Sequence, residues 1–215
     1  YALADSYRAQ GELAAAIKHY RRALEIDPRQ PRVNLDLGVC LMKLGELPEA
    51  VVHLERSLEG DPNNADTRKR LVLILSSLKQ YPQMQAHAQS LVDFDANDVI
   101  ARLHLAHALK KQKRYADALA HYRVAVEQQP DSVLARNDIA WLLATCPDES
   151  IRDGRSAVRH AIAACEVTSF RHPAILDTLA AAQAEAGEFE EATETLKSAL
   201  EIATQSGDSR LPTII

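Results

Sequence analysis

Residues 31–64 read PRVNLDLGVCLMKLGELPEAVVHLERSLEGDPNN, and this stretch contains two helical patterns separated by a short break. Apolar side chains recur at helical spacing through Leu37, Leu41 and Leu44 in the first pattern and Ala50, Leu54, Ser57 and Leu58 in the second. Gly45 can adopt the left-handed conformation that ends a helix, and Pro62 cannot continue one. The stretch therefore predicts a helical hairpin.

The hairpin recurs along the chain with a period of 34 residues. The breaks fall at Gly11, Gly45, Lys79 and Lys113, and a column of apolar residues keeps the same step through Ala16, Ala50, Met84 and Ala118. We expect six repeats, near residues 1–30, 31–64, 65–98, 99–132, 133–169 and 170–204, followed by a tail at 205–215. Because a single hairpin cannot bury both of its faces, the repeats should stack into one α-solenoid.

The repeated residues resemble the tetratricopeptide repeat. They are Tyr7, Gly11, Ala16, Tyr20, Ala23 and Pro28 in the first repeat and Tyr115, Ala118, Tyr122, Ala125 and Pro130 in the fourth repeat. The resemblance covers residues 1 to about 204 and implies an all-α, right-handed α-solenoid of about six helix-turn-helix repeats. The third repeat has Lys79 in place of glycine and Ala96 in place of proline, so we expect it to be packed more loosely than the other repeats.

Residues 140–148, AWLLATCPD, are similar to a C-terminal module of many bacterial tetratricopeptide proteins. This similarity implies a bacterial origin and a chain that is part of something longer. It leaves open a substrate-recognition or assembly domain of a larger enzyme or of a membrane-anchored protein. We also expect an irregular loop at about 145–153, after which the repeat resumes.

Composition excludes several classes of function. The net charge is -5, so the chain lacks the basic excess that non-specific nucleic-acid binding requires. No apolar run approaches the ~20 residues that span a bilayer. Three widely spaced cysteines favour free thiols and a reducing compartment such as the cytoplasm, while the resemblance leaves a periplasmic portion of a membrane-anchored protein possible.

Catalytic and cofactor motifs are not found in the sequence. It has no phosphate-binding glycine loop, no nucleophile elbow, no HExxH pair and no CxxC pair, so we expect neither enzymatic activity nor a cofactor. A ladder of histidines recurs every 34 residues through His19, His53, His87 and His121. Stacked helices lie ~8–10 Å apart, too far for such residues to share one metal ion, so we attribute the ladder to repeat duplication.

In the tetratricopeptide family the first helix of each repeat lines a concave groove. The resemblance therefore gives the candidate partner-binding residues Lys69, Arg70, Leu73, Leu103, His104, His107, Lys110, Lys111, Asn137 and Trp141. Lys69 would suit a clamp for a terminal carboxylate, but Leu73 stands where that clamp needs asparagine. Trp141 has two alternatives, a groove anchor or a core residue beneath the following loop.

The distribution of charge predicts the chemistry of the partner. Residues 65–132 contain 10 basic and 7 acidic side chains, whereas the segments before and after them are net acidic. We therefore expect a non-catalytic protein-interaction scaffold that binds a protein or peptide segment in its groove. The segment should be acidic with interspersed apolar residues.

Overall fold

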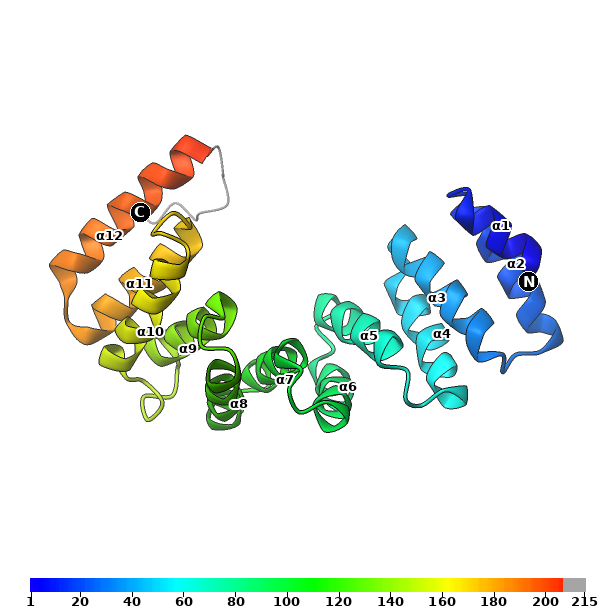
Figure 1. The fold of residues 1–215 in the computed structure, drawn as a ribbon, viewed down its shortest axis with the longest axis horizontal. Helices are drawn as coiled ribbons and strands as arrows, with labels where there is room; N and C mark the ends of the chain where they lie inside the picture. Colours follow the sequence, from blue (N-terminus) through cyan, green and yellow to red (C-terminus); the bar gives the residue numbers. More distant parts are fainter. Residues whose placement is uncertain (207–215) are drawn as a thin grey trace. The chain divides into compact units, whose positions relative to one another are not determined.

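The computed structural model describes residues 1–206, which form twelve α-helices and no strand (Figure 1). The helices are α1 (Ala2–Ala9), α2 (Leu13–Ile26), α3 (Pro31–Leu44), α4 (Leu47–Gly60), α5 (Ala65–Ser77), α6 (Tyr81–Phe94), α7 (Val99–Lys111), α8 (Tyr115–Gln128), α9 (Val133–Thr145), α10 (Gly154–Val167), α11 (Pro173–Ala186) and α12 (Phe189–Ser206). The predicted all-α repeat fold is confirmed. Of the expected tail at 205–215, residues 207–215 lie outside the described part of the chain.

The chain divides into two compact units, Tyr1–Ala108 and Leu109–Ile215, with the boundary inside α7. In the first unit α1 packs on α2, α3 on α4 and α5 on α6, and the second helix of one hairpin also packs on the first helix of the next, as α2 does on α3 and α4 on α5. In the second unit α9 packs on α10 and α11 on α12, while α8 contacts α9, and α10 contacts α11. Within each unit, neighbouring hairpins thus share a core, which is the packing of a repeat protein.

Two kinds of residue form the turns inside the hairpins. Gly11, Gly45 and Gly187 have φ of 82°, 82° and 84°, the left-handed region that glycine enters without steric cost. Lys79 and Lys113 adopt the same region, with φ of 58° and 64°. The hydrogen bond after Lys79, from Gln80 N to Leu75 O at 2.9 Å, matches the one after Gly45, from Glu46 N to Leu41 O at 3.0 Å. The lysine turn therefore closes as the glycine turn does.

Mostly small side chains form a buried column on the second helices. Ala16, Ala50, Ala118 and Ala157 are fully buried, and Met84 in the same column is buried as well. The first helices contribute a second buried column, made of Leu37, Leu71, Leu105, Ile139 and Leu179. The core therefore runs along each unit between its helices rather than forming a single central cluster.

The connection from α9 to α10 covers residues 146–153 and is irregular, as expected. Arg152 ties it to the next hairpin, because its Nε donates to Glu185 Oε1 at 3.0 Å. Asp153 caps α10 by accepting from the main-chain N–H of Ser156 at 2.9 Å, and these bonds to Ser156 lower the pKa of the Asp153 carboxyl. The loop is therefore anchored at its C-terminal end.

The three cysteines, Cys40, Cys146 and Cys165, are buried free thiols. Burial raises the pKa of Cys40, and it raises that of Cys165 to about 11. These two thiols remain protonated at neutral pH and are poor nucleophiles. In the described part of the chain no helix is both long enough and apolar enough to cross a bilayer.

Candidate functional site

The exposed face of α5 carries three of the predicted binding residues. Leu73 is 54 % exposed and has no core role, so it offers apolar surface to a partner. Lys69 is also exposed, but its Nζ lies 2.9 Å from Oδ2 of Asp98, and this hydrogen bond raises the pKa of Lys69. Arg70 is half-buried. Of these three side chains, Leu73 and Lys69 are exposed to solvent, and Lys69 is held by its ion pair.

Asp98, which the sequence analysis did not single out, has two roles. It caps α7 by accepting from the main-chain N–H of Ala101 at 2.9 Å, and it pairs with Lys69. Burial disfavours its charged form, but the cap and the Lys69 ammonium outweigh burial and lower the pKa of Asp98. The ion pair neutralises much of the positive charge that Lys69 was expected to present to a partner.

The predicted residues on α7 are less accessible than those on α5. Leu103 is only 7 % exposed, so it packs in the core and presents little surface to a ligand. His104 and His107 are half-buried, and burial lowers the pKa of His104. The His107 ring lies edge-on to Tyr81 with 6.3 Å between ring centroids. Burial thus disfavours the charged form of the His104 ring, and the His107 ring packs against Tyr81.

In the second unit Lys110 lies in a polar cluster with Asp138 and Tyr122. Its Nζ is 3.6 Å from Asp138 Oδ1 and 5.7 Å from the centroid of the Tyr122 ring. Burial raises the pKa of Asp138, and the nearby ammonium only partly offsets this effect. Lys110 is therefore engaged by its own chain, and Lys111, the next residue, is exposed at the helix end.

Asn137 and Trp141 lie one helical turn apart on α9. The indole of Trp141 is 39 % exposed, so the structure leaves a large part of it open to solvent instead of covering it with the loop. Asn137 has a buried Oδ1 without a hydrogen-bond partner in the described chain. An acceptor that is buried without a donor costs free energy. Among the predicted residues, this pair combines an exposed aromatic ring with a polar atom that lacks a hydrogen-bond partner.

The histidine ladder serves structural contacts. His19 stacks on Tyr7 with ring centroids 5.3 Å apart, and His53 Nδ1 lies 2.9 Å from Oδ1 of the buried Asn34. Burial lowers the pKa of His53 and His87, which keeps both rings neutral near pH 7. Across residues 1–206 no group of three or more His, Cys, Asp or Glu side chains is arranged to hold a metal ion.

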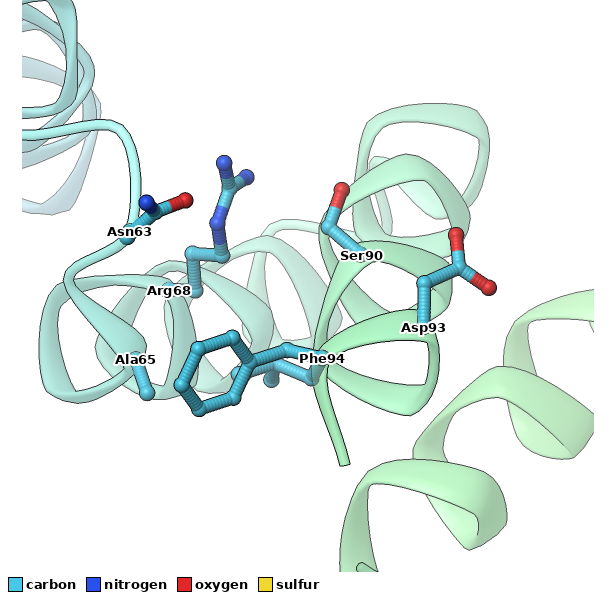
Figure 2. A pocket seen from close by; sticks show the side chains of 7 residues that line it. Asn63, Ala65, Arg68, Ser90, Asp93 and Phe94 are labelled. Atoms are coloured by element: carbon cyan, nitrogen blue, oxygen red, sulfur yellow. The ribbon is translucent and has the colours of Figure 1, made fainter. Parts of the chain in front are cut away.

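A small hollow of about 300 Å³ lies where α5 begins and α6 ends. Figure 2 shows the Phe94 ring, at the end of α6, beside Ala65 and Arg68 of α5. Ser90 and Asp93 line the hollow from α6 as well. The guanidinium of Arg68 is already used, because it donates to the Pro62 carbonyl at 2.7 Å. Phe94 is 68 % exposed, but the rest of this shallow hollow is largely polar.

The fold defines a protein built from helical-hairpin repeats. Sequence models described as tetratricopeptide repeat match residues 7–66, 84–145 and 173–197. The chain belongs to the tetratricopeptide-repeat family. No curated protein matches it.

Solved structures share the fold at low sequence identity. A crystal structure of MamA is 16 % identical with a TM-score of 0.71, covering 86 % of this chain and 98 % of that one. YrrB, described as a TPR protein with an unusual peptide-binding site, is 19 % identical with a TM-score of 0.66, covering 86 % and 92 %. A thermophilic TPR protein of Thermus thermophilus is 20 % identical with a TM-score of 0.61, covering 83 % and 94 %. These similarities concern the fold.

Proposed function

We propose that the chain is a non-catalytic protein-interaction scaffold that holds an extended partner segment against the exposed face of its first helices. The observation that carries the proposal is the pair on α9, the open indole of Trp141 next to the unpartnered acceptor of Asn137. A peptide can engage both residues, because its apolar side chains can cover the indole and its main chain supplies an N–H donor that Asn137 could accept if its side chain turned outward. The peptide site named for YrrB supports the same class of ligand.

The structure changes the chemistry that we propose for the partner. Lys69 and Lys110 are paired with Asp98 and Asp138, so the basic character predicted from the sequence is reduced at two of its centres. We therefore place apolar contact and main-chain hydrogen bonding before charge in this proposal. Lys111 remains the candidate that could steer an acidic segment, since it is exposed at the end of α7.

A peptide-display selection on the purified chain tests the proposal. Peptides selected by the wild-type protein should bind at least tenfold more weakly to Trp141→Ala and to Asn137→Leu. Lys111→Glu should mainly slow association, because exposed charges act on the encounter. An exposed residue on the second helices supplies the control, and Arg22→Ala should leave binding unchanged. If binding ignores Trp141 and Asn137 but responds to the second helices, the proposed surface is wrong.

A further inference from the structure

The last hairpin lacks a polar contact that four earlier hairpins share. In each of those, a side chain near the start of the first helix donates to a main-chain carbonyl six residues earlier in the connecting loop. The donors are Asn34, Arg68, Arg102 and Arg136, and the carbonyls are those of Pro28, Pro62, Ala96 and Pro130. In α11 the equivalent residue is Leu176, three positions before Leu179 as Arg136 is three positions before Ile139. An apolar side chain therefore replaces a loop-binding donor.

The facing position on the second helix changes as well. His19, His53, His87, His121 and His160 occupy it in the five preceding hairpins, each three residues after the buried residue of the core column that contains Ala16 and Met84. In α12 the residue three positions after Ala192 is Thr195. Its hydroxyl is turned to Gln183, donating to Oε1 at 2.8 Å. The last hairpin thus has the pair Leu176 and Thr195 where its predecessor has Arg136 and His160.

These two exchanges coincide with a hollow of about 560 Å³ bounded by α10, α11 and α12. Leu176 and Leu179 form its apolar floor and are nearly fully buried. Ile162 and Phe170 line it from α10 and the loop that follows, with 38 % and 44 % of their surface exposed. The volume is within the range of sites that accept ligand groups.

The loop before α11 holds the Phe170 ring at this hollow by an unusual backbone. Ser169 and Phe170 both have left-handed φ, 51° and 55°. The Phe170 N–H donates to the Cys165 carbonyl at 2.8 Å, which fixes the turn against the end of α10. A bulky residue in this conformation is disfavoured by itself, so the contacts around it must maintain it.

The rim of the hollow is acidic. Glu191 and Glu194 line it from α12, and neither forms an ion pair with another described residue. Between residues 173 and 206 there are seven acidic side chains and one basic one, Lys197. The equivalent place in the preceding hairpin is basic, because Arg136, Arg159 and Arg123 surround His160 there.

We propose that this hollow is a docking site for a partner-protein segment that inserts apolar side chains between Ile162, Phe170 and Leu176 and places a Lys or Arg against Glu191 and Glu194. The apolar floor supplies contact area, and the unpaired carboxylates select a cationic neighbour. The site is separate from the face of α9 that carries Trp141. It therefore stands or falls independently of the function proposed above.

Titration of the full ¹⁵N-labelled chain with three matched peptides tests the site. The basic apolar probe is acetyl-GSKLFKSG-amide, and its controls are acetyl-GSELFESG-amide and acetyl-GSKSSKSG-amide. We expect the basic apolar probe to shift amide signals of residues 170–183 and 191–198 and to bind at least tenfold more tightly than either control. Added salt should weaken its binding.

Two variants identify the site. Thr195→His restores the residue of the other five hairpins and should fill the hollow, weakening the basic apolar probe at least tenfold. The double substitution Glu191→Gln and Glu194→Gln changes only exposed side chains and should weaken it at least threefold and abolish the salt dependence. Trp141→Ala should bind the probe as the wild type does.

Five results would overturn the proposal. Three concern the probes: binding of the basic apolar probe that is unchanged in Thr195→His and in the double glutamine variant, equal binding of the acidic probe, and absence of any shift with the basic apolar probe. Binding that requires removal of residues 207–215 would assign the hollow to that segment. Self-association in sedimentation that Thr195→His abolishes would assign it to a second copy.

Discussion

Nζ of Lys69 lies 2.9 Å from Oδ2 of Asp98, so a side chain on α5 is tied to the residue that caps α7. Within the first unit, the ion pair links the hairpin of α5 and α6 to the start of α7. It also reduces the charge that Lys69 can offer to a ligand. The same contact thus affects both stability and recognition, and its two effects can be measured separately.

Removing the Asp98 carboxylate should destabilise the fold more than removing its lysine partner. Asp98→Ala loses the helix cap and the ion pair and should lower the free energy of unfolding by about 1–2 kcal/mol at about pH 7. Lys69→Met loses only the exposed pair and should cost less than about 1 kcal/mol. Urea denaturation of both variants and of the double variant measures the separate contributions of the helix cap and the ion pair to the free energy of unfolding. Equal costs would show that the cap contributes nothing.

The Asp98 contribution should disappear in acid. Its folded-state pKa is lowered, so its stabilisation is complete above the unfolded pKa of about 4 and is lost as pH falls through the lower folded value. The difference between wild type and Asp98→Ala should therefore be smaller at about pH 3 than at about pH 7. If the difference in free energy of unfolding between wild type and Asp98→Ala grew on acidification, the pKa of Asp98 could not be lowered in the folded protein.

Trp141 should respond to soluble quenchers in the folded protein. It is the single tryptophan of the chain and 39 % of it is exposed, so iodide should quench its fluorescence appreciably before any denaturant is added. A peptide held on this face should reduce that quenching. The chain unfolded in urea provides the upper limit, and a folded chain that iodide does not quench would place the indole beneath the loop instead.

An alanine at Gly154 should disturb the second unit. A Cβ there would lie 2.5 Å from the Ala186 main-chain nitrogen, and backbone cannot move aside as the end of a side chain can. Gly154→Ala should therefore cost about 1–3 kcal/mol, whereas Arg155→Ala at the next, exposed position should change stability by less than about 0.5 kcal/mol. Urea unfolding of the two variants gives the comparison, and similar stabilities would mean that α10 and the end of α11 separate easily.

Glycine should improve the two turns that contain lysine. Lys79→Gly and Lys113→Gly remove a Cβ from a left-handed residue and should each raise the free energy of unfolding by about 0.5–1 kcal/mol. Lys18→Gly makes the same exchange inside α2 and should lower stability by about 1 kcal/mol. In thermal and urea unfolding, the same lysine-to-glycine change should thus raise the free energy of unfolding in the turns and lower it in α2. A change of the same sign at both kinds of position would refute the conformational explanation.

The repeat could be predicted because its signal is periodic. The spacing of Gly11, Gly45, Lys79 and Lys113 indicates where hairpins turn, and the small column at Ala50 and Ala118 indicates where their helices touch. Local physics governs both features, since a turn needs a left-handed residue and closely packed helices need small side chains. Such constraints recur at every repeat and reinforce one another.

The candidate site was harder to predict because it depends on contacts between hairpins. Leu103 shares a helix with exposed residues but turns into the core, and the spacing alone does not distinguish these outcomes. The partners of Lys69 and Lys110 are carboxylates from other parts of the chain, which become neighbours only after folding. The exchange of Arg136 for Leu176 was visible in the register, but its meaning required the carbonyl that the arginine binds.

The last hairpin differs from the others at two positions in register, so its hollow can be regarded as a transferable part. Arg136 and His160 occupy the places that Leu176 and Thr195 take one hairpin later. Exchanging residues between these places would move a recognition feature along the chain without altering the helices that support it. A protein built in this way can acquire or lose a contact by substitution at single positions, with the number and order of its repeats unchanged.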